Sequence, residues 1–186
     1  MRRRAERQEE TRRRIIEAAV ELHGSVGPAR TQVSAIAERA GVERITVYRH
    51  FPDQTSLLRA CREHYLARHP PPDSHWKRIK DPEARLRAGL RAAYAYYAAN
   101  EDMIANVLRD ADALPVGAGF LGFKRQVVQG LSAGWGIRGR RQAHLEALLN
   151  LAADFSTWRS LARRSGLTQE EAIELIAWWA RCLLER

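Results

Sequence analysis

The chain has 186 residues, enough for one large domain or two small ones, and its net charge of +9 favours a polyanionic partner such as nucleic acid. Its two cysteines, Cys61 and Cys182, lie far apart and form neither a CxxC pair nor a zinc pattern, and no apolar run approaches the ~18 residues of a membrane span. These features argue against a disulfide scaffold, a zinc site and a membrane protein, so we expect a reduced, cytoplasmic protein.

Arginines cluster at the N-terminus, and no apolar stretch follows them as it would in a secretory signal. A basic arm of this kind can follow the minor groove or the phosphates of DNA, and the alternative is a solvated, partly frayed tail. The cluster consists of Arg2, Arg3, Arg4, Arg7, Arg12, Arg13 and Arg14. Periodic apolar residues then predict a first helix from about Glu10 to Ser25, with a stripe formed by Ile15, Ala18, Ala19 and Leu22.

Residues 31–51, TQVSAIAERAGVERITVYRHF, have the pattern of two short helices joined by a tight turn. Thr31 is placed to cap the first helix, and Gly41 to end it at a positive φ where a Cβ would be costly. The second helix is expected from about Glu43 to His50, with Val47 pointing into the core. This arrangement is a helix-turn-helix, a motif that inserts its second helix into the major groove of DNA.

The outer face of the second helix suits DNA better than it suits a protein core. Steps of 100° from Val47 put Ile45 and Arg49 on the opposite face, Thr46 and Tyr48 on the flanks, and Arg44 and His50 nearer the body. These side chains carry donors, a phenol and guanidinium groups, which match phosphates and base edges. The alternative is an ordinary helical hairpin with a solvated outer face, but the small alanine, the turn glycine and the valine occur together at fixed offsets that favour the DNA-binding motif.

The segment GVERITVYRHF, preceded by IAERA, resembles the signature of the TetR (tetracycline-repressor) family of transcriptional regulators, over about residues 11–66. The resemblance implies that Arg44, Ile45, Thr46 and Arg49 face bases or nearby phosphates. It also implies that Tyr48 and His50 grip the DNA backbone and that Thr31, Gln32 and Ser34 touch phosphates. The family often has a lysine where this chain has Gln54, so we expect a weaker, neutral contact there.

Helical patterns continue through the rest of the chain, which predicts an all-α fold of about nine helices. A fourth helix begins near Asp53 and stops at the Pro70-Pro71-Pro72 run. We therefore expect a helix-turn-helix domain with a basic arm at 1–52, a connecting helix at 53–69 and a C-terminal effector-binding and dimerisation domain at 70–186. Further helices are expected after Asp81-Pro82-Glu83, after Asn100, over 120–133, over 140–164 and after a capping box formed by Thr168 and Glu171.

The last two helices are the most strongly patterned, and the apolar arc of the final one is too wide for a single partner helix. We expect this pair to pack against its own copy in a two-fold homodimer, and the alternative is a thick core within one chain. The expected interface residues are Leu148, Phe155, Ile173, Ile176, Trp179 and Leu183. A dimer would read a palindromic operator in double-stranded DNA.

Aromatic and apolar residues of the middle helices are candidates for an effector pocket, although residues of this kind, taken singly, more often belong to a plain core. They are Tyr94, Tyr97, Met103, Val107, Phe120, Phe123, Trp135, Phe155 and Trp158. The resemblance implies that a small apolar or aromatic molecule binds there and controls DNA binding, with repression as the default mode and activation as the alternative.

No catalytic constellation, cofactor motif or metal pattern is evident in the sequence, so we expect no enzymatic activity. A small-molecule-binding or protein-interaction module with an incidental helix-turn-helix stays open as a different reading.

Overall fold

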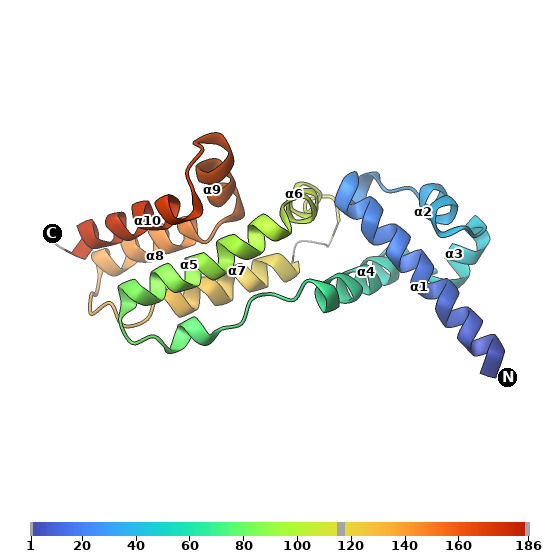
Figure 1. Cartoon of the computed structure of the whole chain (residues 1–186), viewed down its shortest axis with the longest axis horizontal. Coiled ribbons are helices and arrows are strands. Elements are labelled where there is room, and N and C mark those ends of the chain that lie inside the picture. The colour runs from blue at the N-terminus through green and yellow to red at the C-terminus, as the bar shows by residue number, and fades with distance from the viewer. Residues whose placement is uncertain (1, 115–117, 185–186) are drawn as a thin grey trace. The chain divides into compact units, whose positions relative to one another are not determined.

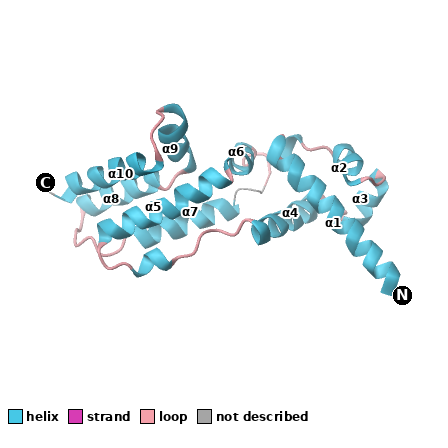
Figure 2. Ribbon diagram, in the orientation of Figure 1, coloured by secondary structure: helices cyan, strands magenta, loops and turns pink. Residues whose placement is uncertain are grey.

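The structure is a computed structural model that describes residues 2–114 and 118–184 (Figure 1). Every regular element in these ranges is helical, which confirms the all-α fold class (Figure 2). The described residues form ten α-helices, against about nine expected. Within the same ranges, no helix combines the length and the apolar character that a membrane crossing requires.

Backbone contacts divide the chain into two compact units. Unit 1 is Met1–Pro70 with Asn100–Ala118, and unit 2 is Pro71–Ala99 with Gly119–Arg186. Residues 100–118 therefore cluster with the N-terminal helices, whereas the sequence pattern grouped all of 70–186 together.

Unit 1 contains five α-helices in its described part. They are α1 (Arg2–Ser25), α2 (Val33–Ala40), α3 (Arg44–His50), α4 (Gln54–Arg68) and α6 (Glu101–Arg109), and a 3-10 turn spans Pro28–Arg30. Helix α1 begins at Arg2 instead of near Glu10. The extra residues are arginine, alanine, glutamate and glutamine, which have high helix propensity but no apolar periodicity that would reveal a helix.

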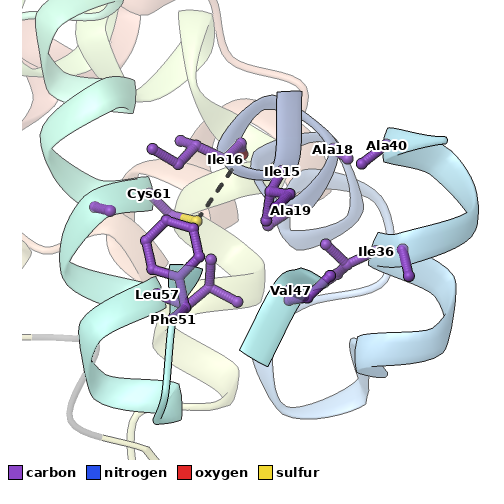
Figure 3. Packing of buried hydrophobic residues seen from close by; sticks show 12 residues of the cluster. Ile15, Ile16, Ala18, Ala19, Ile36, Ala40, Val47, Phe51, Leu57 and Cys61 are labelled. Atoms are coloured by element: carbon purple, nitrogen blue, oxygen red, sulfur yellow. Dashed lines mark hydrogen bonds between the residues drawn. The ribbon is translucent and has the colours of Figure 1, made fainter. Parts of the chain in front are cut away.

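The core of unit 1 is organised around α1, where Ile15 and Ala19 are fully buried. Figure 3 shows Ile36 and Val47 on the helix-turn-helix side of this core, with Phe51, Leu57 and Cys61 on the α4 side. The Cys61 thiol faces the carbonyl of Ile16 at 4.0 Å, and burial raises the pKa of this thiol to about 12. Cys61 is thus a neutral member of an apolar core. These contacts fix α2 and α3 against α1.

Helix α6 is joined to the C-terminal end of α1 by polar contacts. The Asn106 side-chain amide donates to the carbonyls of His23 and Gly24 at 3.1 and 2.7 Å. The carboxylate of Asp110 accepts the Ala29 amide N–H at 2.9 Å. The last carbonyls of a helix have no intrahelical partner, so α6 supplies donors where α1 needs them.

Unit 2 begins with a proline-containing segment and a 3-10 turn at His75–Arg78. Its α-helices are α5 (Pro82–Ala99), α7 (Ala118–Leu131), α8 (Arg140–Ala152), α9 (Phe155–Arg159) and α10 (Gln169–Leu184), with a π-helical turn at Ser160–Arg164. Helix α10 packs against α5 and α8, and α7 contacts α5 through the ring pair Tyr97–Phe120 (Figure 1). Ion pairs join α5 to α10, with 2.7 Å between Arg87 and Glu174 and 2.6 Å between Arg91 and Glu170.

The cap of α10 is the predicted capping box. The Thr168 backbone N–H donates to the Glu171 carboxylate at 2.7 Å, and the Glu171 N–H donates to the Thr168 hydroxyl at 3.2 Å. This reciprocal pairing confirms that α10 begins directly after Thr168.

The single helix expected over 140–164 is wrong. Helix α8 ends at Ala152 and α9 begins at Phe155. Between them Asp154 acts as an N-cap whose carboxylate accepts the Ser156 N–H at 2.9 Å. The local competition from this carboxylate favours a new helix start over continuation of the old one.

Two tyrosines of α5 stabilise the break. The hydroxyl of Tyr94 donates to the carbonyl of Ala152 at 2.8 Å, and that of Tyr97 donates to the carbonyl of Ala153 at 2.7 Å. Both side chains are fully buried, so the carbonyls that leave the helix ladder remain hydrogen-bonded inside the core. The break thus depends on residues far away in the sequence, which periodicity over 140–164 does not reveal.

Candidate DNA-binding interface

The turn between α2 and α3 is built on Gly41, which has the left-handed conformation with φ 63° and ψ 43°. Its amide N–H donates to the carbonyls of Ala37 and Glu38, and the Val42 N–H donates to Ala37 at 2.9 Å. These bonds close α2 and redirect the chain into α3. The prediction that Gly41 ends the first helix at a positive φ is confirmed.

The prediction that Thr31 caps α2 is wrong. Gln32, not Thr31, is the N-cap residue, and its side chain makes no capping hydrogen bond. The Thr31 hydroxyl donates instead to the carbonyl of Gly27 at 2.7 Å and closes the preceding 3-10 turn. Gln32 and Ser34 are exposed, and the Ser34 hydroxyl donates to the Gln32 side-chain oxygen at 3.4 Å.

Helix α3 is held in unit 1 by one buried side chain, Val47, which is 1% exposed. On the other side Ile45 is 59% and Tyr48 45% exposed, and Arg44 and Arg49 are exposed as well. Among the described residues, none forms a hydrogen bond or an ion pair with the side chains of Arg44, Tyr48 or Arg49. The face that the sequence analysis selected therefore points into solvent with its donors available.

Two further predicted residues of α3, Thr46 and His50, are half-buried at its flanks. Gln54 is the first residue of α4 and is exposed, and the preceding Asp53 caps that helix by accepting the Ser56 N–H at 2.7 Å. The predicted recognition residues thus lie together on and around α3.

A surface depression of about 480 Å³ lies in unit 1 beside the start of α2. Its lining combines an apolar floor with the basic side chains of Arg30 and Arg109 and includes Leu22, Ser25, Val26, Thr31, Gln32 and Ala35. Sequence reasoning missed Arg30 because this residue lies in the 3-10 turn, outside the helical periodicity. A basic residue three positions before Val33, the first residue of α2, was the available signal.

The aromatic residues chosen for an effector pocket form a packed cluster in unit 2. The centroid of the Tyr97 ring lies 5.7 Å from those of Phe120 and Phe155. It lies 5.9 Å from that of Trp158 and 6.3 Å from that of Phe123. Edge-on and tilted contacts at these distances fill space efficiently. Burial raises the pKa of the Tyr97 hydroxyl, which therefore stays a neutral donor.

The remaining pocket candidates are not members of this cluster. Met103 and Val107 belong to α6 in unit 1 and are half-buried there. Trp135 follows α7, and its indole N–H donates to the carbonyl of Leu131 at 2.7 Å. A small cavity of about 40 Å³ in unit 2 is lined by Trp76, Phe123 and Val127 among others. The assignment of an effector pocket stays a prediction.

The residues chosen for the dimer interface divide by exposure. Phe155, Ile173 and Ile176 are buried within unit 2, whereas Trp179 is 37% exposed. Leu148 and Leu183 are half-buried. The sequence choice omitted two large exposed residues of the same helices, Leu151 at 51% and Trp178 at 53%. The interface stays a prediction, and the buried members Phe155, Ile173 and Ile176 have almost no surface to share with a second copy.

Residues 15–61 match the family model described as bacterial regulatory proteins, tetR family. The helix-turn-helix segment of this chain is therefore a TetR-family segment. The "Probable HTH-type transcriptional regulator ArpR" of Pseudomonas putida is 37% identical over 86 residues, which cover 46% of this chain and 39% of ArpR. The HTH-type transcriptional regulator TtgR of Pseudomonas putida is 45% identical over 60 residues, covering 32% of this chain and 29% of TtgR. The matches thus span well under half the length of these curated relatives.

The TetR fold extends over almost the whole chain. The TetR-family regulator PfmR from Thermus thermophilus superposes with a TM-score of 0.60 at 19% identity, over 92% of this chain and 97% of that one. At such low identity the likeness establishes the TetR fold and nothing more specific.

Proposed function

We propose that this protein is a sequence-specific DNA-binding transcription regulator that reads operator DNA with α3. One observation carries the proposal: a short helix, anchored by Val47, presents Arg44, Ile45, Tyr48 and Arg49 to solvent with their polar groups unpaired within the described structure. The match of residues 15–61 to the TetR family supports it.

The outward side chains of α3 provide both kinds of contact that DNA recognition needs. The guanidinium groups of Arg44 and Arg49 can donate two hydrogen bonds to a guanine edge, and Ile45 can pack on a thymine methyl group. The Tyr48 hydroxyl suits a phosphate oxygen, as does the imidazole of His50. In this proposal Thr46 contributes at the flank of the same face.

Backbone positioning falls to the start of α2. Gln32 and Ser34 are exposed there with polar side chains, and Arg30 adds a positive charge two residues earlier. Thr31 is half-buried, and its hydroxyl would have to leave the carbonyl of Gly27 to donate to a phosphate. Contacts of this type orient a protein on the duplex without reading sequence.

The proposed regulator acts as a homodimer on a palindromic operator. Leu151 of α8 and Trp178 and Trp179 of α10 leave apolar surface exposed on two helices that pack together within unit 2. Pairing of this surface with a second copy would bury it, and a two-fold dimer matches two half-sites one helical turn apart, about 34–36 Å.

Control by a small apolar or aromatic effector, with repression in its absence, completes the proposal. It is supported by the aromatic cluster around Tyr97 in unit 2. Such a protein binds and releases ligands without catalysing a reaction, and it acts in the cytoplasm where its operator lies. Activation instead of repression is the alternative within this proposal, and a reporter gene under the operator distinguishes the two.

Selection of bound sequences from random duplex DNA tests the proposal. We expect a palindromic consensus that binds the full chain with an affinity falling steeply as salt rises, because phosphate contacts release counterions. Recovery of no preferred sequence would overturn specific recognition. Salt-resistant binding to an acidic protein would favour the protein-interaction module instead.

A further inference from the structure

Three consecutive arginines of α1, Arg12, Arg13 and Arg14, point to different partners within unit 1. We propose that Arg12 and Arg14 are positioning residues that hold the two ends of the recognition helix α3 against α1 and so set its orientation for base reading. This inference deepens the proposed function and rests on it for its DNA readout. It differs from the interpretation of the whole arginine cluster as a DNA-binding arm.

Arg14 holds the turn that precedes α3. Its guanidinium group donates to the carbonyl of Ala40, the last residue of α2, and to the carbonyl of Gly41 at 3.1 Å. Carbonyls at a helix end lack intrahelical partners, and a cation is stabilised at that negative end. A Cβ added to Gly41 would lie 2.8 Å from Arg14 Nη2, so the glycine leaves the room that the guanidinium group uses.

Arg12 holds the residue that follows α3. Its guanidinium carbon lies 4.8 Å from the centre of the Phe51 ring, and Phe51 is the C-cap of α3 and 3% exposed. A guanidinium group over a ring face is attracted by the ring quadrupole. The side chain of Arg12 is itself half-buried, which distinguishes it from a solvated arm residue.

We call Arg12 and Arg14 together the clamp. Their spacing along α1 argues against a row of side chains that bind phosphates from one face of the helix. Residues two apart on a helix lie about 200° apart around its axis, so Arg12 and Arg14 cannot face one surface together. Arg14 instead contacts the turn before α3, and Arg12 contacts the residue after α3. Arg13 between them pairs with Glu10 and Glu17 at 2.8 and 3.1 Å.

Helix α3 needs such tethers because it is short and has a single buried anchor, Val47. Its ends lie about 5 Å from this anchor at 1.5 Å per residue, and a tilt of about 10° around Val47 would displace them by about 1 Å. Recognition side chains must be held within about 0.5 Å and 10–20° of the productive geometry. Tilting therefore damages base contacts more than it damages the looser phosphate contacts.

The test compares Arg12→Gln and Arg14→Gln with Arg13→Gln, a matched control that also removes one positive charge from α1. Affinities for the selected operator and for a random duplex are measured across a salt series with the full chain. We expect Arg12→Gln and Arg14→Gln to weaken operator binding about tenfold or more while the salt slope stays unchanged. Arg13→Gln should keep the ratio of specific to non-specific affinity, and Arg14→Lys should restore part of the loss because it can donate to one of the two carbonyls.

Two outcomes would overturn the clamp. A parallel loss on both DNAs, with the salt slope reduced by about one, would make the arginines phosphate contacts. Equal effects of all three glutamine variants would reduce the result to net charge.

A second measurement is independent of DNA. Amide hydrogen exchange over residues 41–51 should be faster in Arg12→Gln and Arg14→Gln than in Arg13→Gln, with the thermal unfolding midpoint as a control for folding. Unchanged exchange would refute the clamp even if operator binding is weakened. Faster exchange in a protein that selects no DNA sequence would refute the proposed function and leave the clamp standing.

Discussion

Replacement of Gly41 by alanine is expected to lower the free energy of unfolding of unit 1 by about 1–2 kcal/mol. Gly41 lies at φ 63° and ψ 43°, a conformation that costs an L-residue roughly this amount because its Cβ approaches the carbonyl oxygen. Asparagine tolerates this region better, so Gly41→Asn should cost less than Gly41→Ala.

The alanine also has a steric effect that can be separated from the conformational one. Its Cβ would lie 2.8 Å from Arg14 Nη2, closer than contact distance, so the guanidinium group must shift and its bonds to the turn weaken. In an Arg14→Gln background that contact is absent. The cost of Gly41→Ala should then fall by about 0.5–1 kcal/mol, the coupling energy of two residues in contact.

Urea unfolding of the full chain, followed by far-ultraviolet circular dichroism, measures all four proteins of this double-mutant cycle. Operator affinity of the same proteins shows whether the turn also positions α3. The reasoning is refuted if Gly41→Ala is as stable as the wild type within about 0.5 kcal/mol. Equal alanine costs in both backgrounds would refute the contact between Gly41 and Arg14.

Three further outcomes follow from single residues. Arg44→Ala should relax base preference by about 1–3 kcal/mol at one position, whereas Tyr48→Phe should weaken binding similarly on all sequences. Unchanged selectivity of Arg44→Ala in a competition assay would contradict this expectation. Tyr97→Phe leaves the buried carbonyl of Ala153 without its donor and should cost about 1–3 kcal/mol in urea unfolding, which a wild-type midpoint would disprove. Burial lowers the pKa of His23 from 6.5 to about 4, so the unfolded chain takes up the proton first and stability should fall as pH decreases from 6.5 towards 4, by up to on the order of 3 kcal/mol. His23→Gln should flatten that part of the pH–stability curve, and an unchanged curve would exclude His23 as its source.

Local pattern predicted much of this fold. The apolar spacing around Ile36 and Val47 located α2 and α3, and the φ of Gly41 followed from its place between them. The outward face of α3 followed from the same geometry. Once one residue of a helix is known to point inward, the 100° step per residue fixes the direction of every other side chain. Capping residues such as Thr168 could also be predicted, because their hydrogen-bond partners lie only a few residues away in the sequence.

Features that depend on distant residues could not be predicted in this way. The break after α8 requires Tyr94 and Tyr97, which lie more than fifty residues earlier in the chain. The role of Arg14 depends on carbonyls 26 and 27 residues away, and a run of arginines looks the same whether it meets phosphate or protein. Thr31 was assigned as a cap because capping preference does not distinguish the end of a 3-10 turn from the start of a helix.

The polypeptide enters unit 1 twice, since Asn100–Ala118 returns to it after α5. A fragment ending at Pro70 would therefore not be a complete folding unit. It would lack α6, and the carbonyls of His23 and Gly24 would lose the Asn106 amide that satisfies them. Dissection of this protein for DNA-binding studies should consequently retain α6, for example by a circular permutation that joins residues 100–114 to the N-terminal helices. Transfer of the N-terminal helices of this chain alone to another protein would meet the same problem, because the transferred segment would be separated from the α6 that completes it.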